Sequence, residues 1–177
     1  MKYSTIPIAS LTGAAVLTVG VTVAGFGSAA AQPNDYSTLP VDPNLITDSL
    51  AYNAAPLTFN PNGQPGVTAV YTHRDGARQI TSTILVLPDP AAASAAVNGS
   101  QAVANPKTQP AAVGSGGTIA SGTSPDGSKS VTVLTFTQGD AATTIEFDGP
   151  QADPVPADLV LELGRKQDTA IRDWQAS

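Results

Sequence analysis

The chain contains no cysteine, one histidine and one methionine among its 177 residues. Without cysteine it can form no disulfide bond, carry no lipid on an N-terminal cysteine and use no catalytic thiol. Zinc sites require several histidine or cysteine ligands, so a zinc site built from these residue types is excluded. We therefore expect no metal centre of this kind, no cofactor, and a fold that depends on its hydrophobic core.

Charged residues are also scarce, at 12% of the chain, and 14 acidic residues outnumber 8 basic ones. The formal net charge is −6, and it becomes −7 if Lys2 is removed with the N-terminal segment described next. A negative field repels phosphate backbones and anionic lipid surfaces. Nucleic acid is therefore not an expected partner.

Residues 1–31 have the pattern of a secretory signal peptide. Lys2 is followed by the apolar run LTGAAVLTVGVTVAGF and by the small residues 29–31, so we expect cleavage after Ala31 and a secreted or cell-envelope protein. The alternative is an uncleaved membrane anchor, because roughly twenty apolar residues can span a bilayer. Three glycines near the end of the run and the lack of a following basic cluster favour cleavage.

Residues 32–66 contain six prolines and the turn-rich run NPNGQPG, which predict a mostly extended and irregular arm. One short helix is expected in VDPNLITDSL, with Asp42 as its N-cap and Pro43 as its first residue. Residues 67–177 are expected to form a single α+β domain.

A β-hairpin is predicted around Asp75-Gly76, because a two-residue type I′ turn favours this dipeptide. Paired residue numbers then sum to 151, which places six residues on one face of the sheet and continues that face at Val86. The predicted pairs are Tyr71 with Ile80, Ala69 with Ser82, and Val67 with Ile84. His73 lies opposite Arg78 beside the turn, where side chains usually contact water.

A three-stranded meander is predicted at about 117–122, 130–137 and 141–147, after a loop at 106–117. SPDG at 124–127 forms the first turn and Gly139-Asp140 the second. Numbers paired across the second hairpin sum to 279, which pairs Phe136 with Thr143, Leu134 with Ile145, and Thr132 with Phe147. Both phenylalanines, Leu134 and Ile145 are therefore expected in the core.

Two helices complete the predicted fold. Asp89 caps the first, which Pro90 begins and Asn98-Gly99 weakens or ends. The second is amphipathic, with Glu162–Lys166 and Asp168–Arg172 pairs, and its inner face is made by Val160, Leu163, Gln167, Ala170, Ile171 and Trp174. The resulting ββ-α-βββ-α order predicts an α+β fold with helices packed on an antiparallel sheet of five or more strands.

Few residues are candidates for catalysis. His73, Arg74 and Asp75 could form an acid–base group, but they lie at a hairpin tip without a third member, so we predict no catalytic residue. Four turn aspartates lack the DxDxDG spacing of a calcium loop, and turn aspartates usually bind their own backbone. These are Asp126, Asp140, Asp148 and Asp153. GSGG at 114–117 lacks the lysine of a phosphate loop.

Three stretches carry a family resemblance: HRDGARQITSTILVLPDPAAA followed by a glycine-rich segment, SPDGSKSVTVL, and the C-terminal helix. With the signal sequence, they make the chain similar to small exported mycobacterial and actinobacterial envelope proteins of the LpqN/LpqT type. The resemblance implies a PsbP-like sandwich and a role in binding or envelope interaction. Such proteins are often lipoproteins, whereas this chain has no cysteine to acylate.

The predicted function is that of a secreted, non-enzymatic module that binds a protein or an apolar, envelope-derived ligand between sheet and helices. Residues that could line such a pocket are Val67, Tyr71, Ile84, Leu134, Phe136 and Trp174; the simpler interpretation is that they fill the core. Two alternatives remain open at this point. One is a structural, antigen-like envelope protein held by an uncleaved N-terminal helix, and the other is an enzyme that uses the His73 group.

Overall fold

The structure is a computed structural model that describes residues 35–46, 50–97 and 103–177. These residues belong to one compact unit, Gln32–Ser177. The predicted signal peptide and its cleavage site lie outside the described residues. None of the helices in the described ranges is both long and apolar enough to cross a membrane.

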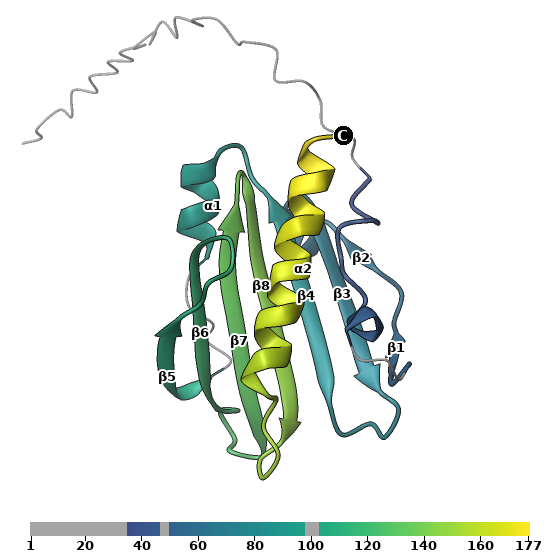
Figure 1. Cartoon of the computed structure of the whole chain (residues 1–177), viewed down its shortest axis with the longest axis vertical. Helices are drawn as coiled ribbons and strands as arrows, with labels where there is room; N and C mark the ends of the chain where they lie inside the picture. Colours follow the sequence, from purple (N-terminus) through teal and green to yellow (C-terminus); the bar gives the residue numbers. More distant parts are fainter. Residues whose placement is uncertain (1–34, 47–49, 98–102) are drawn as a thin grey trace, which may run out of the picture. The chain divides into compact units, whose positions relative to one another are not determined.

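Eight strands in the described residues form one antiparallel sheet, ordered β1-β3-β4-β8-β7-β6-β5, with β2 also paired to β3 (Figure 1). The strands are β1 Tyr52–Ala54, β2 Thr58–Phe59, β3 Gly66–His73, β4 Gln79–Val86, β5 Ala104–Pro110, β6 Ser115–Thr123, β7 Lys129–Gln138 and β8 Ala141–Pro150. The α+β class is confirmed. The prediction missed β1, β2 and β5: the first two are very short, and β5 contains two prolines that suggested a loop.

The register of the β3–β4 hairpin is confirmed, since Tyr71 pairs with Ile80 and Val67 with Ile84. The predicted type I′ turn is wrong. Gly76 has a φ of +70°, but Asp75 keeps a negative φ, and the Gly76 N–H donates to the His73 carbonyl at 2.8 Å. The loop therefore has four residues instead of two, and the register survives because both loops have the same centre.

The β7–β8 hairpin is confirmed in full, with Phe136 opposite Thr143 and Leu134 opposite Ile145. Phe136, Leu134 and Ile145 belong to one hydrophobic core, together with Val67, Ala69, Tyr71, Ile80 and Ile84 of the β3–β4 hairpin. Phe136, Leu134 and Ile145 are completely buried. Alternation along each strand thus places the large apolar groups of both hairpins on one side of the sheet.

Helix α2, Ala157–Gln175, covers that side of the sheet (Figure 1). Its close approach depends on Gly164, because a Cβ atom at this position would lie 2.4 Å from a side-chain carbon of Leu134. The predicted inner face is confirmed at Val160, Leu163, Gln167, Ile171 and Trp174, which are buried. Ala170 is only half-buried, and Gly164 and Asp168 complete the buried side.

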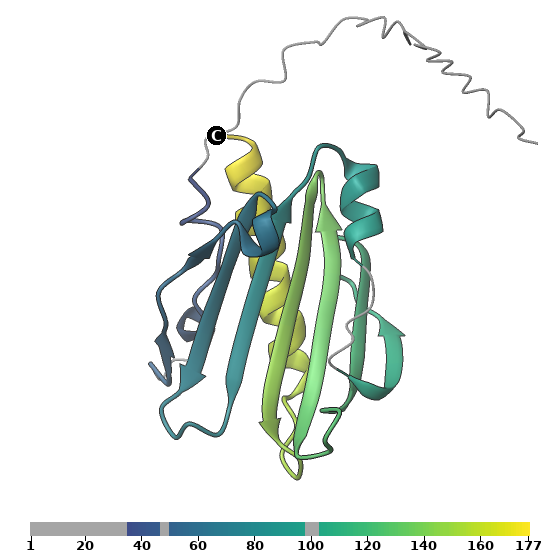
Figure 2. The same ribbon diagram turned by 180° about the vertical axis from the view of Figure 1, so that it is seen from behind.

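Helix α1, Pro90–Ala96, packs on the opposite side, against β7 and β8. The Asp89 carboxylate accepts the Ala92 N–H at 2.7 Å, so the predicted N-cap is confirmed. Val103 packs on Val131 and Val133 on the same side. Figure 2 shows that no described helix covers the middle of β3, β4 and β8 there.

A row of threonines crosses this opposite face. Direct strand pairing places them at one level across β2, β3, β4, β8, β7 and β6: Thr58, Thr68, Thr83, Thr144, Thr135 and Thr118. Neighbouring strands lie about 4.8 Å apart, so the side chains repeat at that interval. The hydroxyls of Thr68 and Thr83 lie 3.0 Å from each other.

The segment predicted as an irregular arm contributes to the core. Tyr36 and Leu39 of this segment are buried in the core. Two 3₁₀ turns, η1 Pro43–Leu45 and η2 Pro61–Gly63, separate the extended parts of the segment. The Asp42 carboxylate accepts the Asn44 N–H at 2.9 Å, as expected of an N-cap. In the described part of the predicted helix, residues 43–45 form a 3₁₀ turn; residues 47–49 lie outside the described residues.

Candidate functional site

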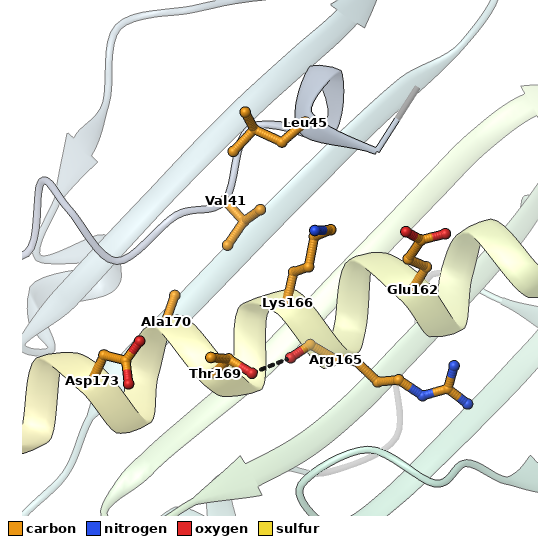
Figure 3. Close-up of a pocket in the computed structure, with 8 residues that line it drawn as sticks. All are labelled: Val41, Leu45, Glu162, Arg165, Lys166, Thr169, Ala170 and Asp173. Carbon is orange, nitrogen blue, oxygen red and sulfur yellow. Dashed lines mark hydrogen bonds between the residues drawn. The ribbon is translucent and has the colours of Figure 1, made fainter. Parts of the chain in front are cut away.

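A groove of about 580 Å³ lies between the N-terminal arm and the outward side of α2 (Figure 3). We call it the α2 groove. Its lining residues come from two segments far apart in the sequence: Val41 and Leu45 from the arm, and Glu162, Arg165, Lys166, Thr169, Ala170 and Asp173 from α2. The volume falls within the range of about 300–1,000 Å³ that is usual for small-molecule sites.

The apolar part of the α2 groove is formed by Val41, Leu45 and Ala170. Leu45 is 72% exposed, so most of its aliphatic side chain is accessible to solvent or to a ligand. The Asn44 side chain holds η1 in place, because its amide donates to the Tyr52 carbonyl and its oxygen accepts the Tyr52 N–H, both at 2.9 Å. The neighbouring Leu45 is therefore held at the surface by a fixed turn.

The charged part of the α2 groove comes from α2 alone. The predicted Glu162–Lys166 ion pair is wrong: among the described residues, no carboxylate lies within ion-pair distance of the Lys166 ammonium. The predicted Asp168–Arg172 pair is confirmed at 2.5 Å. Figure 3 shows the Lys166 ammonium on the same side of the helix as Val41 and Leu45.

Gln167 fixes the distance between arm and helix. Its side chain is completely buried, and its amide donates to the Leu39 carbonyl at 2.6 Å while its oxygen accepts the Val41 N–H at 3.0 Å. The Trp174 indole adds a hydrogen bond to the Asp35 carbonyl at 3.2 Å. One helix therefore binds the backbone of the arm and also supplies one wall of the α2 groove.

The His73 group at the β3–β4 turn stabilises the turn. His73 Nδ1 lies 2.7 Å from an Asp75 carboxylate oxygen, and its ring meets the Tyr52 ring edge-on at 5.2 Å. The pKa of the Asp75 carboxyl is lowered below its usual value, mainly because it accepts a hydrogen bond from the Ala77 N–H and secondly because it is hydrogen-bonded to His73. The His73 and Asp75 side chains are 26% and 48% exposed, so the predicted contact with water is confirmed.

Arg78 extends this turn group to the end of the sheet. It pairs with Asp153 and lies 3.8 Å from the Asp75 carboxylate. Arg74 is exposed, and its backbone N–H donates to the Ala51 carbonyl at 2.8 Å. These contacts join the β3–β4 turn to the segments before β1 and after β8.

The six residues predicted as pocket lining all lie in the hydrophobic core. Their exposed fractions range from 0% for Val67, Ile84, Leu134 and Phe136 to 8% for Trp174. None of them lines the α2 groove or the smaller hollows found in the described residues. The structure thus places these six side chains as core filling.

A second hollow, of about 340 Å³, lies at the start of β7 and the end of β8, beside the β6–β7 turn. Asp126 there accepts hydrogen bonds from the Ser124 hydroxyl at 2.5 Å and the Ser128 N–H at 3.1 Å, which lower its pKa to about 2. Burial, followed by the neighbouring Asp148, raises the pKa of Glu146. Lys129 lies 3.8 Å from the Asp148 carboxylate.

The predicted calcium candidates do not converge. Asp126 binds its own turn, Asp153 pairs with Arg78, and Asp140 accepts a hydrogen bond from Gln175 at 2.7 Å. Within the described ranges, no group of three histidine, cysteine or acidic side chains is arranged to hold a metal ion.

The α2 groove was missed because it depends on a contact between residues more than 100 positions apart. The sequence signal was present but weak: Leu45 follows the capped turn, and α2 has a charged outer face. The chain matches no protein-family model, no curated protein and no solved structure.

Proposed function

We propose that the protein is an exported, non-enzymatic binding module of the cell envelope or extracellular space, and that it holds a small ligand in the α2 groove. The observation that carries the proposal is the aliphatic surface of the exposed Leu45 and the half-buried Val41 beside Lys166, which has no ion-pair partner in the part of the chain that the structure describes. Ligand sites of this kind combine an apolar wall with a few polar groups that fix orientation. The pattern of residues 1–31 supports export.

A binding role is favoured over catalysis because the side chains of the His73 group contact their own turn. His73 and Asp75 are engaged with each other, with the Ala77 backbone and with Tyr52, and both are partly exposed at a hairpin tip. A general base needs a positioned substrate next to it, in a site that excludes water. The resemblance to LpqN/LpqT-type envelope proteins agrees with this role, and a PsbP-like layout remains part of the proposal.

The test is native mass spectrometry of the full-length gene product, purified from the culture medium of its own host. We expect a chain that begins at Gln32 and carries a noncovalent small molecule. Ala170→Trp should remove that molecule, because the indole would fill the α2 groove. Ala95→Trp on the exposed side of α1 is the matched control and should retain it.

Two results would contradict the proposal. A bound molecule that persists in Ala170→Trp would place the ligand elsewhere, and a wild-type protein that is always empty would exclude a tightly held small ligand. Circular dichroism of both tryptophan variants separates loss of ligand from loss of fold.

A further inference from the structure

We infer that the ligand of the α2 groove is an aliphatic monocarboxylate, with its carboxylate at Lys166 and its chain along Val41, Leu45 and Ala170. The inference rests on the proposed function and adds the chemical class of the ligand. Three features of the α2 groove support it, which are its cation, its apolar wall and the acidic residues at its ends.

Two cations line the α2 groove, Arg165 and Lys166, and Figure 3 shows that Arg165 is directed away from Val41 and Leu45, so Lys166 is the cation on the side of the apolar wall. Lys166 is exposed, and no carboxylate in the described ranges lies within ion-pair distance of its ammonium. Arg172, nearly two helical turns further along α2, is paired with Asp168 at 2.5 Å. An ammonium that lacks an ion-pair partner among the described residues and lies beside an apolar surface is complementary to the carboxylate of an amphipathic ligand.

The apolar wall selects the rest of the ligand. Val41 and Leu45 lie on the side of α2 that carries Ala170 and Lys166 (Figure 3). Leu45 exposes 72% of its surface. Full burial of one methylene improves binding by about fourfold, and the open side of the α2 groove lowers this to about twofold. A longer aliphatic chain therefore gains more from this wall than a short acid.

Two carboxylates limit the charge of the ligand. Glu162 and Asp173 line the α2 groove on either side of Lys166 along the helix (Figure 3). A monoanion can contact the ammonium between them, whereas a phosphate monoester carries a charge of about −1.5 to −2 at pH 7 and is repelled more strongly. The same carboxylates oppose docking of an anionic membrane surface.

The test is a titration of the exported wild-type protein with octanoate, decanoate and dodecanoate below their micelle concentrations, by calorimetry at low salt. Affinity should rise about twofold per methylene. Lys166→Gln should weaken dodecanoate binding by about threefold to fivefold, and Glu162→Gln should strengthen it by about twofold. Lys107→Gln, which removes an exposed cation on β5, should change nothing.

The two α2 variants are predicted to change dodecanoate affinity in opposite directions, which reports the sign of the ligand's charge. Tighter binding of dodecyltrimethylammonium than of dodecanoate, or weaker binding in Glu162→Gln, would overturn the inference. So would binding that appears only on vesicles of anionic phospholipid, which would indicate a membrane contact. If dodecanoate fails to bind while Ala170→Trp still loses the molecule that copurifies with wild type, the ligand class is wrong and the binding module stands.

Discussion

Replacing Gln167 by leucine tests whether one buried amide holds the arm against α2. Gln167 is completely buried and makes two hydrogen bonds to the arm, one with the Leu39 carbonyl and one with the Val41 N–H. Leucine has a similar volume but leaves both backbone groups without their partner. Each buried group left unpaired costs about 1–3 kcal/mol, and Val41 is only half-buried, so we expect a total loss of about 2–4 kcal/mol.

The loss is measurable because a domain of this size unfolds with a free energy of about 5–15 kcal/mol. Urea denaturation should show a lower midpoint with an unchanged slope. The melting temperature should fall by roughly 6–12 °C, at about 3 °C per kcal/mol for a domain of this length. Amide exchange at Val41 should accelerate more than exchange in β7, since the change loosens the arm first.

Thr169→Ala is the matched control on the same helix. Its hydroxyl donates to the Arg165 carbonyl on an exposed surface, so its removal should change stability by less than about 0.5 kcal/mol. If Gln167→Leu lowers the free energy of unfolding by less than about 0.5 kcal/mol and amide protection at Val41 is normal, Gln167 does not hold the arm against α2.

Three further changes have defined outcomes. Gly164→Ala should destabilise by about 1–2 kcal/mol in urea, because its methyl group would meet Leu134 and helix propensity offsets only part of that cost. Asp126→Asn should lower stability at pH 7, and its gap to wild type should close as the pH falls from 3.8 toward about 2, because the folded pKa of Asp126 is depressed. Glu146→Gln should raise stability at pH 7, since the raised pKa of Glu146 means that ionisation opposes folding; this gain should vanish when acid protonates wild type. If the difference in urea midpoint between wild type and either variant stays the same as the pH falls, the corresponding pKa shift is contradicted.

Local chemistry was enough to predict the two hairpins. Alternation of apolar residues around Asp75-Gly76 and Gly139-Asp140 fixes which residues face each other, and a wrong register would expose the core. The turn at Asp75 was predicted with the wrong type because loops of two and four residues with the same centre give the same pairing. Register was therefore predictable where the backbone conformation of the turn was not.

The arm and the candidate site could not be predicted from local patterns. Strands β1 and β2 have three and two residues, too few for a periodic signal, and they exist because β3 offers an edge for pairing. The α2 groove requires Leu45 of the arm and Lys166 of α2, which are 121 positions apart in the sequence, to line the same surface. The outer residues of α2 follow no apolar period, and the spacing of Glu162 and Lys166 predicted an ion pair between them instead of a groove.

The clamp between arm and α2 has a consequence for how the chain is made. Its hydrogen bonds join residues 126 to 139 positions apart, so the first folded segment meets its partner only when the last helix has been synthesised. Contacts of such long sequence separation form late and slowly. A chain in which α2 has not yet been made therefore leaves Tyr36 and Leu39 without part of the surface that buries them in the folded protein.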